Sequence, residues 1–292
     1  MIKEEQLKYS LLLFLSIILI ICACEVINPD ETIPSHMSIH SINLQTDYSL
    51  QGTNSNKITD AWVYVDDQLI GAFELPATFP VLMTGIHQVV VRPGIKVNGI
   101  NATRGSYPFY QQIEINNKNL PEGEILYLDS LETSYVSYTD FAWMEDFEDG
   151  GVSIEPTSRS DTGIQKTSVI ENIFEGGYSG IVYLDSDNSF FELKTSDAYV
   201  LPKSSAPVFL ELNYKSNNIF TIGVFANSIN ESTQHSILII NKSEVWNKIY
   251  VNLTNRVSTE TSAIDFQIFF GGIKDDDVTF GKIILDNIKL IH

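Results

Sequence analysis

The chain has 292 residues, with 37 acidic and 18 basic side chains and a formal net charge of −19. This balance makes nucleic acid a poor partner, because the phosphate backbone is bound through lysine and arginine. It also argues against broad electrostatic attraction to anionic lipid.

The first 23 residues are typical of an export signal. Residues 11–21 form an apolar run that only Ser16 interrupts. The run is about half the roughly 20 residues that a transmembrane helix needs, and its length suits the apolar core of a signal that is removed after export. Lys3 and Lys8 are balanced by Glu4 and Glu5, whereas such signals normally begin with a net positive charge.

The next residues, Ile21-Cys22-Ala23-Cys24, resemble the lipobox of bacterial lipoproteins. The resemblance implies cleavage after Ala23, lipid attachment to Cys24 and anchoring by acyl chains. An uncleaved hydrophobic anchor and cleavage by an ordinary signal peptidase are the alternatives. The usage of Ile, Asn and Lys resembles lipoproteins of Bacteroidetes type, which implies the outer membrane, with the side that the protein faces left open.

Cys22 and Cys24 are the only cysteines in the sequence. If Cys22 leaves with the signal and Cys24 is lipidated, no disulfide can form and the body must rely on its hydrophobic core. Residues 24–37 contain prolines and little apolar periodicity, which predicts a tether. His36 and His40 have the spacing of metal ligands on a helix, but Pro34 makes a helix doubtful, so no metal is predicted there.

Residues 38–130 show strand and turn patterns that predict a small antiparallel β-sandwich of immunoglobulin-like size. A hairpin with Asp66-Asp67 at its turn stands out, and its sequence resembles small β-domains of bacterial envelope proteins, which act as spacers. The other strands follow at regular intervals. The predicted strands are 61–65, 68–73, 85–94 and 111–115.

Residues 131–145 are predicted to be a linker, and residues 146–292 a jelly-roll β-sandwich. Helix signals are nearly absent from the second domain. The fold class is therefore all-β, with an immunoglobulin-like sandwich followed by a jelly roll. The predicted strands are 180–184, 190–194, 208–215, 220–226, 236–240, 248–253, 265–270 and 279–290.

Three segments of the second domain, 146–150, 246–253 and 284–290, resemble the galactose-binding-like jelly rolls that include many carbohydrate-binding modules. The resemblance implies carbohydrate binding and a structural Ca²⁺ held by Glu148 and Asp286, since clustered carboxylates and carbonyls supply the oxygens that calcium needs. The alternative is that both acids are exposed turn or strand-end residues. The cluster at 275–277 is interpreted as a solvated hairpin turn.

Sugar binding needs an exposed aromatic ring beside groups that hydrogen-bond hydroxyls. In strand 208–215 the apolar residues alternate with a polar face, which predicts one buried side and one exposed side. Phe209, Glu211 and Asn213, with Lys215, lie on the polar face and are the predicted ligand-binding residues. Other aromatics of the domain are further candidates for such a ring, but a sandwich core needs most of them, and Trp246 at a strand start is expected in the core. These candidates are Tyr178, Tyr183, Phe191, Tyr199, Tyr214 and Trp246.

No catalytic motif appears in the sequence: there is no Gly-x-Ser-x-Gly elbow, no His-Glu-x-x-His helix and no phosphate-binding loop. Two hypotheses remain. The first is a non-catalytic membrane-anchored lipoprotein whose jelly roll binds glycan. The second is a structural or adhesion subunit that contacts other envelope proteins.

Overall fold

The computed structural model describes residues 6, 8, 9, 13, 14 and 33–292. The predicted signal peptide, Cys24 and most of the predicted tether lie outside these residues. No helix in the described part of the chain is long and apolar enough to cross a membrane.

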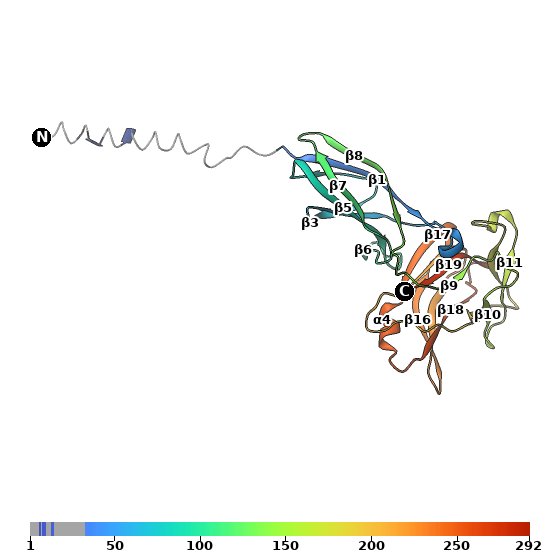
Figure 1. Cartoon of the computed structure of the whole chain (residues 1–292). Coiled ribbons are helices and arrows are strands. Elements are labelled where there is room, and N and C mark those ends of the chain that lie inside the picture. The colour runs from blue at the N-terminus through green and yellow to red at the C-terminus, as the bar shows by residue number, and fades with distance from the viewer. Residues whose placement is uncertain (1–5, 7, 10–12, 15–32) are drawn as a thin grey trace.

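The N-terminal domain is a β-sandwich built from eight strands and one short helix (Figure 1). A three-stranded sheet has the order β4-β1-β8, in which β1 and β8 run parallel; in the other sheet β3, β2, β5 and β6 follow one another and β7 also pairs with β5. The elements are β1 (Ser35–Gln45), α3 (Tyr48–Gln51), β2 (Asp60–Val65), β3 (Gln68–Glu74), β4 (Ala77–Val81), β5 (Gly85–Lys96), β6 (Arg104–Ser106), β7 (Ile113–Leu120) and β8 (Ile125–Ser134).

The C-terminal domain is a jelly-roll sandwich of two sheets. One sheet has the order β11-β12-β19-β14-β17, with β9 paired to β19, and is called the covered sheet below; the other has the order β10-β13-β18-β15-β16 and is called the open sheet. The elements are β9 (Phe141–Glu145), β10 (Ile154–Pro156), β11 (Ile164–Thr167), η1 (Ile170–Asn172), β12 (Ser179–Leu184), β13 (Phe190–Thr195), β14 (Phe209–Ser216), β15 (Phe220–Asn227), β16 (Ser232–Ile240), β17 (Ser243–Asn252), α4 (Thr254–Thr259), β18 (Asp265–Ile273) and β19 (Gly281–Ile291).

The strand predictions are confirmed wherever alternation is long. The predicted hairpin is β2 and β3, and both turn residues, Asp66 and Asp67, have the positive φ that a tight two-residue hairpin turn needs. All eight strands predicted for the second domain are present. The alternation therefore specifies the strands because each places one row of side chains in the sandwich core.

Two domain limits differ from the prediction. β1 begins at Ser35, inside the predicted tether, where it pairs with Val81 on β4. The predicted linker 131–145 contains the end of β8 and the whole of β9, which joins the jelly roll by pairing with β19. The linker between β8 and β9 is therefore residues 135–140, because the residues on either side of it belong to strands and satisfy their backbone groups in a sheet.

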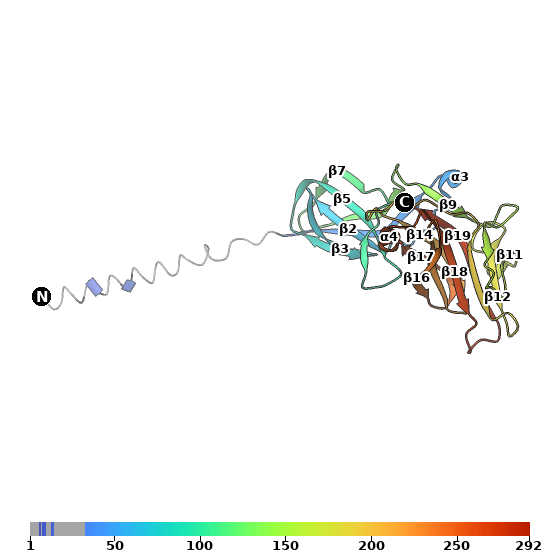
Figure 2. The same ribbon diagram turned by 90° about the horizontal axis from the view of Figure 1, so that it is seen from below.

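The two domains meet along the outer face of the covered sheet (Figures 1 and 2). A third hydrophobic core, separate from the two sandwich cores, fills this contact. Aromatic rings from 107–110 pack edge to face on Phe209 and Tyr250. The contact core consists of Leu44, Ile95, Tyr107, Phe109, Tyr110, Tyr135, Phe209, Tyr250 and Ile291.

Residues 46–59 of the N-terminal domain, here called the strap, lie across the same face. The Thr53 carbonyl accepts a hydrogen bond from Lys289 Nζ at 2.6 Å, and Ser55 Oγ accepts one from Asn213 Nδ2 at 2.9 Å. The Lys57 backbone N–H donates to the Tyr250 hydroxyl at 2.9 Å. Aromatic packing and strap contacts together join the two sandwiches into one body.

Candidate functional site

The predicted ligand face on β14 lies inside the contact between the domains. Phe209, Glu211 and Asn213 do share one face of the strand, as alternation predicts, but all three are buried. The expectation that β14 has one exposed side is wrong, because the N-terminal domain covers that side. A surface open to a ligand must therefore be sought elsewhere on the jelly roll.

Glu211 is the polar centre of this contact and is 0% exposed. Its carboxylate accepts hydrogen bonds from the Tyr107 hydroxyl at 2.9 Å and the Tyr135 hydroxyl at 3.1 Å. Lys248 Nζ lies 3.0 Å from Oε2 and supplies the balancing charge. Burial first, and then the charge of Glu211, raises the pKa of both tyrosines well above the ordinary value. The carboxylate thus holds the two domains together.

Glu148 and Asp286, predicted as calcium ligands, both contact the loop 174–179. Glu148 Oε1 accepts hydrogen bonds from the backbone N–H groups of Gly177 and Tyr178, at 2.8 and 2.9 Å. Asp286 is buried and accepts from the Ser179 hydroxyl at 2.6 Å and its neighbour's backbone N–H at 2.7 Å. Burial raises the pKa of Asp286 to about 7.

These surroundings do not fit a calcium ion. Calcium needs six to eight oxygen ligands, whereas hydrogen-bond donors surround both carboxylates. Among the residues that the structure describes, no three His, Cys, Asp or Glu side chains converge as metal ligands. Binding of calcium by Glu148 and Asp286 stays a prediction from sequence resemblance.

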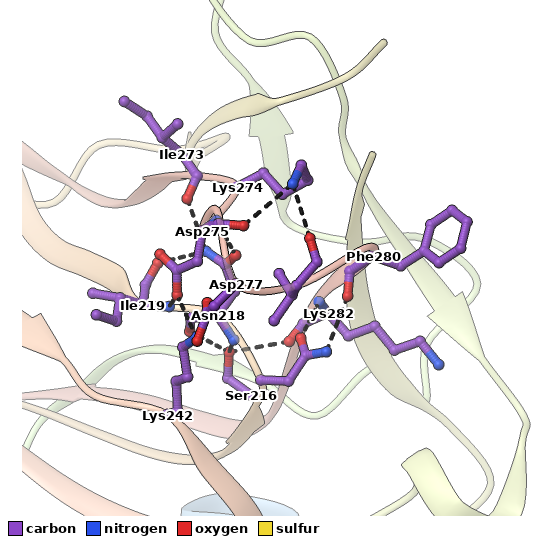
Figure 3. Close-up of polar contacts among 12 residues, drawn as sticks. Ser216, Asn218, Ile219, Lys242, Ile273, Lys274, Asp275, Asp277, Phe280 and Lys282 are labelled. Carbon is purple, nitrogen blue, oxygen red and sulfur yellow. Dashed lines mark hydrogen bonds and ion pairs between the residues drawn. The ribbon is translucent and has the colours of Figure 1, made fainter. Parts of the chain in front are cut away.

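The acidic cluster at 275–277 forms a turn, but not the predicted hairpin turn, because the flanking strands β18 and β19 belong to different sheets. Figure 3 shows its polar contacts. Asn218 is fully buried beneath it and donates to the Ile273 carbonyl while accepting from the Asp275 backbone N–H. Lys242 lies 3.0 Å from Asp275 and 2.6 Å from Asp277, and its hydrogen bond holds the pKa of Asp277 below the ordinary value. The turn is therefore fixed at one end of the open sheet.

The outer face of the open sheet is not covered by the N-terminal domain, and it carries a second buried carboxylate. Glu192 on β13 is 3% exposed. It accepts hydrogen bonds from Thr157 Oγ1 at 2.8 Å and Gln234 Nε2 at 2.9 Å. Arg159 Nη1 lies 3.5 Å from Oε2. The Arg159 side chain is largely exposed. The partners of the Glu192 carboxylate are therefore two neutral donors and one cation that faces the solvent.

The bond between Glu192 and Gln234 shows that this face is curved into a trough. β13 and β16 are separated by β18 and β15, a span of about 14 Å in a flat sheet. Two side chains can meet across such a span only if the sheet curls. The strands between them carry Gly271, opposite Glu192, and Gly223, and each leaves a gap in its row of side chains beside Thr221 and Phe269. A Cβ at Gly223 would overlap the His235 carbonyl and the Phe269 ring.

Aromatic rings line the same trough. Phe190, two residues before Glu192 on the same face, is partly exposed, and the Arg159 guanidinium lies 5.8 Å from its ring centroid. Phe269 is buried in the floor and packs on the partly exposed Phe225 at 5.4 Å. A ring and an exposed guanidinium on one concave surface, beside an amide, can together stack on an apolar face and hydrogen-bond hydroxyls, while the buried Glu192 carboxylate positions the amide and the guanidinium.

The trough forms an open cleft of about 420 Å³, a volume within the usual range for ligand sites. A larger hollow of about 660 Å³ lies between strap and jelly roll, but Phe174 is the single ring in its lining. Two smaller cavities of about 200 and 260 Å³ also lie against the strap or the N-terminal domain. The trough on the open sheet is thus the candidate site, and it is formed by the jelly roll alone.

A ligand site on this face was not predicted from the sequence. Phe190 and Glu192 have the spacing of Phe209 and Glu211, so the signal used for β14 was equally present on β13. Phe191 lies between Phe190 and Glu192 on β13, so its side chain points to the opposite face of the strand, into the core. Of the other candidate rings, Tyr178 and Tyr183 are more than 40% exposed, and Tyr183 lies on β12 of the covered sheet.

No protein-family model and no curated protein matches this sequence. Solved structures are similar in fold. The C-terminal family 22 carbohydrate-binding module of Clostridium thermocellum Xyn10B is 10% identical with a TM-score of 0.38, covering 51% of this chain and 92% of the module. The family 11 module of C. thermocellum Lic26A-Cel5E is 16% identical with a TM-score of 0.34, covering 51% and 92%.

Two further similar structures are described as an adhesin domain and as an enzymatically active domain. The cleaved adhesin domain K3 of Lys-gingipain from Porphyromonas gingivalis W83 is 14% identical with a TM-score of 0.36, covering 52% of this chain and 98% of the domain. The enzymatically active domain of bacteriophage CBA120 tailspike protein 4 is 12% identical with a TM-score of 0.37. It matches 47% of this chain, and this chain spans only 18% of its length.

Proposed function

We propose that the jelly roll binds a carbohydrate chain in the trough of the open sheet, and that the protein is a non-catalytic lipoprotein held at the outer membrane by acyl chains on Cys24. The observation that carries the carbohydrate proposal is the meeting of Phe190, Arg159, Gln234 and Glu192 on one concave face. Sugars bind where an aromatic face lies beside planar amide, guanidinium and carboxylate groups.

The trough suits binding rather than hydrolysis. A glycosidase needs two carboxyl groups that face the scissile bond from opposite sides. Glu192 and Asp275 both line the cleft, but Glu192 is tied by three side chains. Asp275 accepts from the Ile219 backbone N–H and pairs with Lys242. Neither carboxylate is free to act as an acid or a nucleophile.

The test of carbohydrate binding is affinity electrophoresis and calorimetry of residues 33–292 with xylan, mixed-linkage β-glucan, galactan and mannan. Phe190→Ala and Arg159→Ala are expected to weaken binding by about tenfold or more, since each removes a stacking or hydrogen-bonding partner. Tyr183→Ala is the matched control, because this exposed ring lies on the other sheet. Failure of every polysaccharide, with an envelope protein captured by crosslinking, would favour the structural or adhesion hypothesis.

The lipid anchor has a separate test. Cys24→Ser is expected to move the protein from the membrane to the soluble fraction while both domains stay folded, because all described strands begin at or after Ser35. Mass spectrometry of the mature N-terminal peptide should show acyl chains on Cys24. A mature chain that starts elsewhere, or that carries a free thiol at Cys24, would refute the anchor.

A further inference from the structure

Exposed apolar side chains gather at the end of the N-terminal sandwich where the described chain begins. Five residues, here called the tip patch, are exposed by between 41% (Ile125) and 78% (Leu82). This end of the sandwich is remote from the jelly roll (Figures 1 and 2). The tip patch consists of Ile33, Leu82, Ile86, Ile125 and Tyr127.

Strand pairing brings these residues together. Ser35 pairs with Val81, so Leu82 follows at the level of Pro34. In the parallel pair, His36 lies beside Ile125 and Ser38 beside Tyr127. Leu126 and Leu128 point into the core, which turns Ile125 and Tyr127 to the outside.

Two turns complete the tip. The Gly123 backbone N–H donates to the Pro34 carbonyl at 3.2 Å, and a Cβ at Gly123 would lie 3.4 Å from the Ile33 Cγ2 methyl. Gly85 pairs with Leu120, which places Ile86 beside the same end of the sandwich. These side chains lie around one end of the sandwich, and exposed apolar side chains gathered in this way mark a surface that contacts a protein or a lipid layer.

The chain outside the structure indicates which contact this is. Cys24 precedes Ile33 by nine residues, a stretch that reaches at most about 30 Å when fully extended. A lipid anchor on Cys24 would hold the tip patch within that distance of the membrane surface. Tethering raises the effective concentration of the surface, so a weak apolar contact suffices.

The charges around the patch indicate the kind of lipid. Glu122 and Glu124 are exposed in the turn beside Ile125, and the whole chain has a net charge of −19. Anionic headgroups would repel this end of the molecule. A neutral, zwitterionic surface would accept apolar side chains without that repulsion.

We propose that the tip patch docks on the neutral surface of the lipid layer that holds the acyl chains of Cys24. This inference rests on the lipid anchor of the proposed function and extends it from attachment alone to a fixed orientation. Because the two domains form one body, docking at the tip sets the direction in which the jelly roll and its trough face.

The experiment replaces the biological lipid by a chemical one. The chain from Cys24 onward contains every strand of both domains and a single thiol, so it can be coupled through Cys24 to a maleimide phospholipid in phosphatidylcholine vesicles. Amide hydrogen exchange is measured in segments 82–86 and 121–127. Coupling is expected to slow exchange there by about threefold or more relative to the same protein coupled to soluble maleimide.

The variant Leu82→Ser, Ile86→Ser and Tyr127→Ser is expected to lose this protection. The control variant Ile170→Ser, Ile229→Ser and Val245→Ser changes three side chains that are equally exposed on the jelly roll, and it should retain the protection. Vesicles of equal parts phosphatidylcholine and phosphatidylglycerol should protect the tip less.

Unchanged exchange on phosphatidylcholine would overturn the docking proposal, and so would equal protection in the Leu82, Ile86 and Tyr127 variant. Stronger protection on the phosphatidylglycerol mixture would overturn the neutral surface. Protection without vesicles that grows with protein concentration would assign the patch to a second copy of the chain instead. The maleimide lipid works whether or not cells acylate Cys24, so failure here is distinct from failure of the anchor.

Discussion

Two strands of the jelly roll carry the same local pattern and have different surroundings. Phe209-Leu210-Glu211 on β14 and Phe190-Phe191-Glu192 on β13 each place a ring and a carboxylate on the outer face of a sheet. Both carboxylates are buried. Glu211 is buried by the N-terminal domain, whereas Glu192 is buried within the jelly roll by Thr157, which follows β10, and by Gln234 on β16.

The difference teaches that the partners of a buried carboxylate, more than its burial, indicate its role. Glu211 faces a buried lysine and two buried tyrosine hydroxyls, which are interior groups that depend on its charge. Glu192 faces neutral donors and an exposed arginine, and its cleft stays open on one side. The outer face of the covered sheet binds the N-terminal domain, and the outer face of the open sheet is available for a ligand.

The largest contrast is expected from removing each charge. Glu211→Gln should lower the free energy of unfolding by about 3 to 5 kcal/mol, because Lys248 is then buried without a counter-charge. Glu192→Gln should cost about 1 kcal/mol or less, since its partners are neutral or exposed. Urea unfolding measures both, and equal losses in the two variants would contradict the contrast.

The two rings give the next contrast. Phe209 packs edge to face on Tyr107 at 5.2 Å and Phe109 at 6.1 Å, so Phe209→Ala should cost about 3 kcal/mol through the cavity it leaves. Phe190→Ala should change stability by about 1 kcal/mol or less, because its ring is partly exposed. Thermal unfolding compares the two, and a fully stable Phe209→Ala variant would show that the domains do not depend on this contact.

Lys289 on the covered face should make the stability of the protein depend on pH. Burial first, and then the charge of Lys248, lowers the pKa of Lys289 from 10.5 to about 7. Between these values the unfolded chain binds the proton and the folded chain does not, so the free energy of unfolding should rise with pH, by at most about 1.4 kcal/mol per pH unit. Chemical unfolding between pH 7 and 9 should show this rise in the natural protein and a flatter profile in Lys289→Met.

Asp286 gives an effect of the opposite sign. Its pKa is raised from 3.8 to about 7 by burial, so the folded state binds the extra proton and the free energy of unfolding should fall as pH rises through this window. Asp286→Asn should remove the fall and leave stability at pH 7 equal or higher. If Asp286 held calcium, a chelator would lower the melting midpoint of the natural protein and the variant would be destabilised.

Much of the fold could be predicted from the sequence because strands carry their own signal. The Asp66-Asp67 hairpin and the eight strands predicted for the jelly roll each show alternation over several residues. β10 and β11 have three and four residues, too few for a period to show. β9 lies in the predicted linker, because its residues show no clear alternation and form a strand by pairing with β19.

The sequence showed which residues share a face of a strand, but it could not show which of these faces is open to a ligand. The order of side chains determined which residues share a face of a strand, where the apolar run and the two cysteines lie, and that the chain is acidic. It did not determine which of the two Phe-x-Glu faces is covered. That depends on contacts such as Tyr107 with Glu211, which join residues 104 positions apart. Alternation is a local property of a strand, whereas covering a face requires a distant segment to pack on it, and only the tertiary structure decides that.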